Sequence, residues 1–139
     1  MESRLEIRVE PWTDAHDAEV REAFSGHTRR KMDTSAGLLQ PTEYLRQGAF
    51  CRVLRDDEPV CWYVLFVHRY LTATEVEVAL AYGHAEFDLV AEVLPLIELQ
   101  CQEADSICIT TRRRGLVKKL QRQGYRTDAV LMRKQRKKG

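Results

Sequence analysis

The sequence has no apolar run near the roughly 18 to 20 residues that a membrane-spanning helix needs. Its first residues, "MESRLEIRVE", have neither the basic start nor the apolar stretch of a secretory signal. Both absences argue against insertion into a membrane and against secretion. We therefore expect a cytoplasmic protein.

The sequence has no paired metal motif among its four cysteines, whose spacings match none. They lie in apolar stretches with strand-like or helical patterns, at Cys51, Cys61, Cys101 and Cys108. A free cysteine packs as a small apolar side chain when no neighbouring group activates it. We expect buried, reduced thiols and no metal site.

The sequence also lacks internal repeats and long low-complexity segments. Its 139 residues, 44% apolar and 31% charged, suffice for one domain with a sizeable core. We expect a single domain over residues 1–133 and a basic tail over residues 134–139.

The formal net charge of +1 conceals an uneven distribution of charge. Residues 112–139 contain twelve Lys and Arg and one acid, Asp128, whereas residues 1–111 contain ten basic and twenty acidic residues. Either the acidic and basic parts pair with each other within the fold, or they favour binding to a polyanion, binding to a protein partner, or self-association. The basic side chains expected on the surface are Lys118, Lys119, Arg122, Arg133, Lys134, Arg136, Lys137 and Lys138.

Hydrophobic periodicity predicts the element order β-α-α-β-β-β-α-β-α-β. The strands are expected at residues 4–11, 50–54, 60–70, 74–82, 106–111 and 124–134, and the helices at 14–24, 41–48, 86–105 and 114–123. Val76, Val78 and Leu80 are expected on one face of their strand, and His16 at the surface. The fold class is α/β (α+β), a mixed, mostly antiparallel sheet flanked by helices, with one parallel pair formed by the crossover through the long helix.

This order, and the ending "LVKKLQRQGYRTDAVLMRK" with its helix, Gly-aromatic step and last strand, resembles the GCN5-related N-acetyltransferase (GNAT) superfamily. The resemblance covers nearly the whole chain, and small degenerate proteins of this kind occur in bacteriophages, including among proteins of virion assembly. It implies that acetyl-CoA would lie where the strand before the long helix parts from its neighbour. The residues that would contact it are Leu80, Ala81, Tyr82, Gly83, His84 and Ala85, with Arg112, Arg113 and Arg114 near the 3′-phosphate.

Two chemically demanding positions depart from the family pattern. The pyrophosphate loop of the family is [QR]-x-x-G-x-[GA], but "AYGHAEFDLV" retains only Gly83, and Glu86 and Asp88 add negative charge there. The family's general acid is a tyrosine four residues before the glycine of the Gly-aromatic step. Here that position is Leu120, which cannot donate a proton, and Tyr125 is assigned to the core.

Because fold alone does not carry activity, these departures favour a protein without a cofactor that works as a structural or protein-interaction module. Its place would be the host cytoplasm, or the virion if a bacteriophage encodes it. The first alternative is a divergent acetyl-CoA-dependent N-acetyltransferase whose candidate general bases, Glu75 and Glu77, share one face of a strand. The second is non-specific nucleic-acid binding through the basic C-terminal part, which has no base-reading motif.

Overall fold

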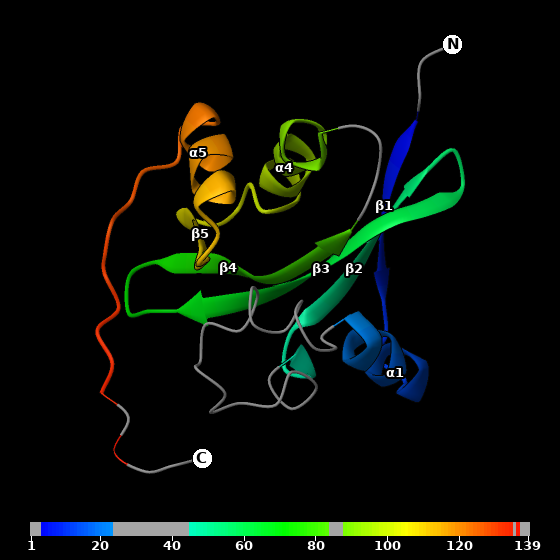
Figure 1. The fold of residues 1–139 in the computed structure, drawn as a ribbon, viewed down its shortest axis with the longest axis horizontal. Helices are drawn as coiled ribbons and strands as arrows, with labels where there is room; N and C mark the ends of the chain where they lie inside the picture. The colour runs from blue at the N-terminus through cyan, green and yellow to red at the C-terminus, as the bar shows by residue number, and fades with distance from the viewer. Residues whose placement is uncertain (1–3, 24–44, 84–87, 135, 137–139) are drawn as a thin grey trace.

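The computed structural model describes residues 4–23, 45–83, 88–134 and 136 (Figure 1). Its helices and strands are β1 (Leu5–Glu10), α1 (Asp14–Ala23), β2 (Ala49–Arg55), β3 (Glu58–Arg69), β4 (Thr74–Gly83), α4 (Leu89–Gln100), β5 (Ser106–Ile109) and α5 (Arg114–Arg122). Most of the helix expected at 41–48 lies outside the described residues. At its end the N–H of Gly48 donates to the carbonyl of Leu45 at 3.0 Å.

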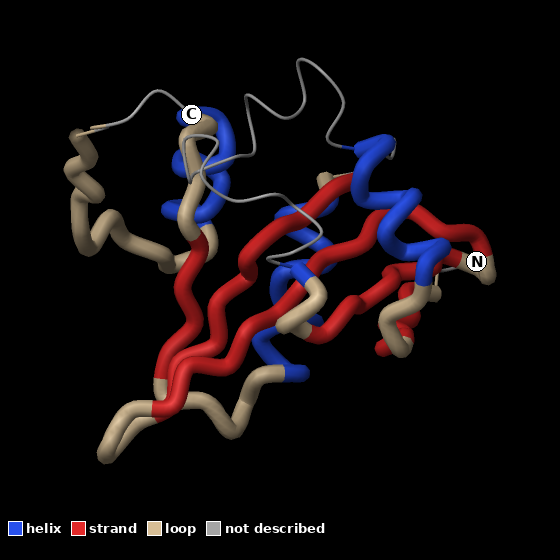
Figure 2. Tube along the Cα trace, turned by 90° about the horizontal axis from the view of Figure 1, so that it is seen from below, coloured by secondary structure: helices blue, strands red, loops and turns tan. Residues whose placement is uncertain are grey.

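The strands form one sheet in the order β1-β2-β3-β4-β5. The first three pairings are antiparallel, and β4 pairs with β5 in parallel through the crossover helix α4. Helices α4 and α5 cover one face, and α1 lies against the other (Figure 1; Figure 2). This arrangement confirms the predicted fold class.

Each face of the sheet carries its own apolar cluster. Under α4 and α5, Val76 and Val78 pack with Leu94 and Ile97, which recur at helical spacing on α4. On the α1 face, the cluster consists of Val20, Ala23, Leu45, Phe50, Trp62, Val64, Phe66 and Leu80. Strand β3 is covered on both faces, which explains its long apolar run "VCWYVLF".

A β-bulge in β4 changes which side chains face which cluster. Val64 pairs with Leu80 and Leu65 with Val78, so Ala79 has no partner of its own on β3. An extra residue reverses the alternation beyond it. Leu80 therefore lies in the α1 cluster while Val78 lies under α4. The prediction that Leu80 shares a face with Val76 and Val78 was wrong for this reason.

The turn between β2 and β3 offers a test of backbone strain. Arg55 pairs with Glu58, and the two residues between them, Asp56 and Asp57, have φ of 49° and 69°. Such a turn favours glycine, because a Cβ is strained at positive φ. We expect Asp57→Gly to raise the free energy of unfolding by about 0.5 to 1 kcal/mol, measured by urea denaturation.

The matched control is Asp56→Gly. The carboxylate of Asp56 accepts a hydrogen bond from the N–H of Arg4 at 3.0 Å. Removing it offsets the relief of strain, so this variant should gain less than Asp57→Gly. An Asp57→Gly protein that is no more stable than the wild type would contradict the explanation by strain, and equal gains at both positions would show that the hydrogen bond from Arg4 contributes nothing.

The strand predicted for residues 124–134 is absent: residues 125–134 form no helix or strand. They run past the β5 end of the sheet without joining it (Figure 1; Figure 2). Three consecutive apolar side chains there are exposed, Val130 by 77%, Leu131 by 66% and Met132 by 84%. Strand-like sequence forms a strand only when it pairs with a neighbour, and in the described structure these residues do not pair with the outer edge of β5. None of the described helices is long and apolar enough to span a membrane.

Candidate functional site

The stretch predicted to contact acetyl-CoA lies where β4 extends past β5. Pairing with β5 covers only Glu75–Val78, whereas β4 continues to Gly83. In this extension Leu80 is buried, Tyr82 is half-buried, and Ala81 is exposed. His84 and Ala85, with Glu86, lie outside the described residues.

Gly83 serves close packing between strands. It pairs with Cys61 of β3, and a Cβ built on it would lie 2.3 Å from the Cβ of Cys61 and 2.9 Å from the carbonyl oxygen of Val60. Among the described glycines only Gly124 has a positive φ, at 92°. The backbone at Gly83 is therefore that of a strand, not that of a loop with amides turned toward a ligand.

The N-terminus of α4 is capped by a carboxylate of the protein itself. The carboxylate of Asp88 accepts hydrogen bonds from the N–H groups of Val90 and Ala91, at 3.1 and 3.3 Å. These are two of the free N–H groups with which a helix start would bind a phosphate. The Nζ of Lys119 lies 3.7 Å from the same carboxylate.

The residues at this helix start do not fit a pyrophosphate. A second anion beside Asp88 would meet repulsion, and the helix dipole is already compensated. No described backbone segment offers a glycine-lined cradle there, since Gly83 is fixed within β4. The sequence analysis expected Asp88 to add negative charge at this loop, and the structure places its carboxylate at the start of α4.

The arginines predicted for the 3′-phosphate lie at the start of α5. Arg112, Arg113 and Arg114 are all exposed. Arg113 occupies the N-cap position without a side-chain capping bond, and its N–H donates to Oγ1 of Thr111 at 3.1 Å. Their role toward CoA stays a prediction.

The candidate bases Glu75 and Glu77 are held on the sheet face opposite α4. Oε1 of Glu77 lies 2.8 Å from Nε2 of His68, whose side chain is 41% exposed. Burial, with Glu75 and Glu77 nearby, raises the pKa of the Cys108 thiol to about 12. Glu77 thus contacts His68, and both carboxylates lie near the neutral Cys108 thiol. Their role as a general base stays a prediction.

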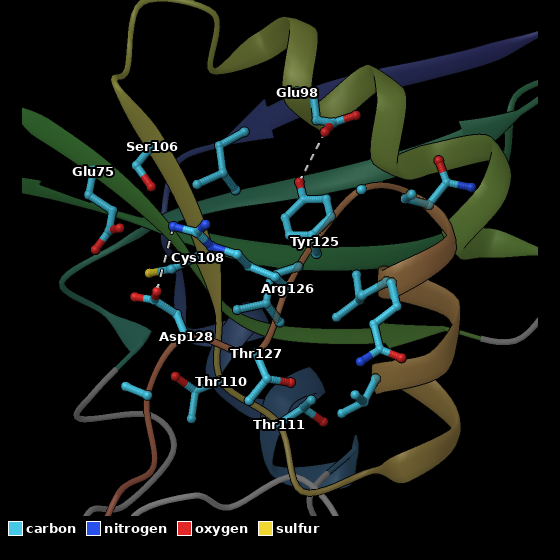
Figure 3. Close-up of a pocket in the computed structure, with 18 of the residues that line it drawn as sticks. Glu75, Glu98, Ser106, Cys108, Thr110, Thr111, Tyr125, Arg126, Thr127 and Asp128 are labelled. Atoms are coloured by element: carbon cyan, nitrogen blue, oxygen red, sulfur yellow. Dashed lines mark hydrogen bonds and ion pairs between the residues drawn. The ribbon is translucent and has the colours of Figure 1, made fainter.

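The position of the family's general acid is apolar. Leu120 is buried in the cluster under α4 and α5. Tyr125 does not replace it, because its hydroxyl donates to Oε2 of Glu98 at 3.1 Å (Figure 3). Burial, with the Glu98 carboxylate beside it, raises the pKa of Tyr125 well above its ordinary value, so its proton is held tightly.

All four cysteines are free thiols, Cys51 and Cys101 buried, Cys61 and Cys108 half-buried. Burial raises the pKa of each thiol, that of Cys61 to about 11. Thiols of this kind are not thiolate nucleophiles at neutral pH. In the part of the chain that the structure describes, no group of three or more His, Cys, Asp or Glu could hold a metal ion.

Sequence reasoning missed a polar network between α1 and the sheet. Arg52 donates to Glu10 at 3.0 Å and to Glu19 at 2.7 Å, and Nε2 of His16 lies 2.9 Å from Oε1 of Glu10. His16 is 8% exposed, so its predicted place at the surface was wrong. A second polar group lies on the same helix: Asp17 is paired with Arg46 and accepts a hydrogen bond from the indole of Trp12.

Hydrophobic periodicity cannot predict this network, because its members are far apart in the sequence. A charged residue within the otherwise apolar strand "AFCRVL" was the one available hint, and it points to Arg52. A cation is rarely placed among buried residues without a carboxylate partner. That hint identifies the cation but not its partners.

The basic residues expected at the surface are exposed wherever the structure describes them. These are Lys118, Lys119, Arg122, Arg133, Lys134 and Arg136, whereas Lys137 and Lys138 lie outside the described residues. Among them, Lys119 forms the ion pair with Asp88 at 3.7 Å. Nucleic-acid binding through this surface stays a prediction.

A cavity in the described structure lies elsewhere, along the outer edge of β5. It measures about 1380 Å³. Its walls come from β5, the residues around the ends of α4 and α5, and residues 123–133 (Figure 3). Polar side chains that line it include Glu75, Glu98, Thr110, Thr111 and Arg126.

Several solved structures that match this fold are acetyltransferases by name, and one is a transcriptional regulator of Bacillus halodurans C-125 with a TM-score of 0.65 at 13% identity, over 95% of this chain and 99% of its own. The ribosomal-protein-alanine N-acetyltransferase of Brucella melitensis biovar Abortus 2308 matches with a TM-score of 0.65 at 14% identity, over 95% of this chain and 98% of its own. The glucosamine-6-phosphate N-acetyltransferase of Arabidopsis thaliana matches with a TM-score of 0.61 at 10% identity, over 96% and 99%. An aminoglycoside N-acetyltransferase in complex with CoA matches with a TM-score of 0.56 at 15% identity, over 98% and 97%.

No protein-family model matches the sequence, and no curated protein matches it significantly. At these identities the structural likeness establishes the fold alone. The chain has the GNAT fold, as its order of elements predicted. What the fold is used for must be argued from this chain's own residues.

Proposed function

We propose that this GNAT-fold protein acts by binding another protein and does not transfer acetyl groups. The observation that carries the proposal is the Asp88 carboxylate on the N–H groups of Val90 and Ala91. An acetyltransferase of this fold needs that helix start for the pyrophosphate of its cofactor. Here the carboxylate of Asp88 already occupies that helix start, so the phosphates of CoA would bind there more weakly.

The interior of the fold supports the same proposal. Leu120 offers no proton to a leaving thiolate, and the hydroxyl of Tyr125 is committed to Glu98. The thiols have raised pKa values and are not nucleophiles. The described residues thus lack both a phosphate cradle and a positioned acid, while the sequence separates an acidic part, residues 1–111, from a basic part, residues 112–139.

Isothermal titration with acetyl-CoA, with CoA as a second ligand, tests the proposal. We expect no heat and no thermal shift at millimolar ligand. Asp88→Asn keeps a capping oxygen and removes the charge, so it should bind acetyl-CoA more tightly than the wild type while retaining its stability. Micromolar binding by the wild type, about −8 kcal/mol, would overturn the proposal.

One observation favours a second candidate, a divergent acetyltransferase. β4 bulges at Ala79 and then continues past the end of β5, which leaves strand backbone beyond the parallel pairing. Backbone of this kind can hold an extended ligand by strand-like hydrogen bonds without glycines. Micromolar acetyl-CoA binding that persists in an Arg112, Arg113 and Arg114 triple alanine variant would favour this candidate and assign binding to the strand.

A further inference from the structure

Helix α5 separates its apolar residues from its basic residues by side. The apolar residues are half-buried or buried against the core beside α4 (Figure 1), at Leu116, Val117 and Leu120. Arg114, Lys118 and Arg122 follow one another at intervals of four residues, and all three are exposed. Four residues advance a helix by about 6 Å and turn it about 40° beyond a full turn. The three cations therefore lie in one row along the solvent side of the helix, the α5 basic row.

The α5 basic row carries an electrostatic cost that the described residues do not offset. Like charges four residues apart repel each other on a helix, and cations at a helix start oppose its dipole. The sequence has no acid between Asp105 and Asp128. Two neighbouring cations are paired, Lys119 with Asp88 at 3.7 Å and Arg126 with Asp128 at 3.8 Å. Within the described part of the chain no carboxylate pairs with a member of the row, so an external anion would relieve its repulsion.

The composition of this surface favours a phosphate backbone over an acidic protein as the anion. None of the exposed residues of α5 has an apolar side chain; they are Arg114, Gly115, Lys118, Lys119, Gln121 and Arg122. Protein–protein interfaces are built around apolar and aromatic anchors, which this surface lacks. Nucleic-acid interfaces are polar and positively charged, with Arg, Lys and Gln donating to phosphate oxygens. A lipid surface fits less well, because the apolar side of α5 is packed in the core and cannot enter a bilayer.

We propose that the α5 basic row binds the phosphate backbone of double-stranded nucleic acid without reading its sequence. The exposed side chains of Arg112 and Arg113, just before the row, add to the same positive surface. Single strands are bound largely by stacking their bases on aromatic side chains. Among the described residues Tyr70 is the one exposed aromatic, and it follows β3, not α5, so a duplex fits better than a single strand. This inference goes beyond the proposed function, because it adds a nucleic-acid ligand to a protein partner.

The test is fluorescence anisotropy with short labelled duplexes of DNA and of RNA, each of random sequence. We expect a micromolar dissociation constant at about 50 mM salt, weakened on the order of a hundredfold at about 200 mM as counterions are released. The variant with Arg114→Gln, Lys118→Gln and Arg122→Gln should bind at least about tenfold more weakly at the lower salt. Its slope of log affinity against log salt should fall by roughly one for each side chain replaced. Because glutamine suits a helix and removes the repulsion, this variant should unfold at no lower urea concentration than the wild type.

The matched control makes the same change of net charge at exposed arginines of β1 and α1 and just before β1, with Arg4→Gln, Arg8→Gln and Arg21→Gln. It should keep most of the affinity and the salt slope of the wild type. An equal loss in both variants would overturn the inference, because net charge and not the row would then decide binding. So would a row variant that binds as the wild type does, or a single strand bound more tightly than either duplex. Tighter binding to poly-glutamate or to phosphatidylserine vesicles than to a duplex would assign the row to an acidic protein or a lipid surface instead.

Discussion

Replacing Gly83 with alanine is expected to lower the free energy of unfolding by about 1 to 3 kcal/mol. The added methyl group would lie 2.3 Å from the Cβ of Cys61 and 2.9 Å from the carbonyl oxygen of Val60. Both atoms are fixed by the β3–β4 pairing, so neither can move aside as the end of a flexible side chain could. The end of β4 and the start of β3, which pair there, must separate or shift, and this removes pairing as well as packing.

The matched control for Gly83→Ala is Gly115→Ala. Gly115 lies in the first turn of α5 and has no atom within 4 Å of a Cβ built on it. Alanine is the better helix former, so this variant should gain up to about 1 kcal/mol. Urea denaturation of both variants measures the difference. A Gly83→Ala protein as stable as the wild type would show that the strands are not in close contact at this position.

The role of Gly83 was the part of the candidate site that was hardest to predict from the sequence. A lone glycine between a strand and a helix is what a phosphate loop and a tight strand pairing both use. Only the position of Cys61 relative to Gly83 distinguishes them, and that position depends on the register of β3 against β4. Asp88 was predicted only as added negative charge within a helix over 86–105, whereas α4 begins at Leu89 and Asp88 is its N-cap.

The fold itself was largely predictable, because local periodicity determines most of its elements. The alternation in β1 and the helical spacing of Leu94 and Ile97 place these elements without tertiary information. The bulge at Ala79 escaped prediction, because a single extra residue leaves the alternation of residue types intact while it reverses the faces. Residues 125–134 escaped prediction for another reason: strand-like sequence describes a preference that becomes a strand only by pairing, and in the described structure these residues do not pair with β5.

Arg52→Met is expected to lower the free energy of unfolding by about 2 to 3 kcal/mol at neutral pH. The Arg52 side chain is 17% exposed, and its guanidinium donates to Glu10 and Glu19 at distances of 2.7 to 3.1 Å. Methionine fills similar space but leaves the Glu10 carboxylate, itself 19% exposed, with His16 as its remaining partner. The cost comes from a poorly compensated buried charge more than from lost packing. Chemical denaturation measures it.

The control for Arg52→Met is Arg8→Met, because Arg8 forms an exposed pair with Glu6 at 4.0 Å. That variant should change the free energy of unfolding by less than about 0.5 kcal/mol. Acid titration separates the charge effect from packing. The hydrogen bond from Arg52 holds the pKa of Glu10 below its ordinary value of 4.5, against the opposing effect of burial. The wild type should therefore keep this stabilisation above about pH 4.5 and lose it as the pH falls through the lower pKa of the folded state.

Without Arg52, burial becomes the larger influence on Glu10, and the pKa of this carboxyl in the folded protein should rise. A raised pKa means that protonation of Glu10 relieves the buried charge. The penalty of Arg52→Met should then be largest near neutral pH and shrink as the pH falls below about 4.5. A difference between variant and wild type that is the same at pH 7 and pH 3.5 would show that the substitution acts through side-chain packing. A difference that narrows in acid would identify the Arg52–Glu10 contact as the electrostatic link between the sheet and the polar network under α1.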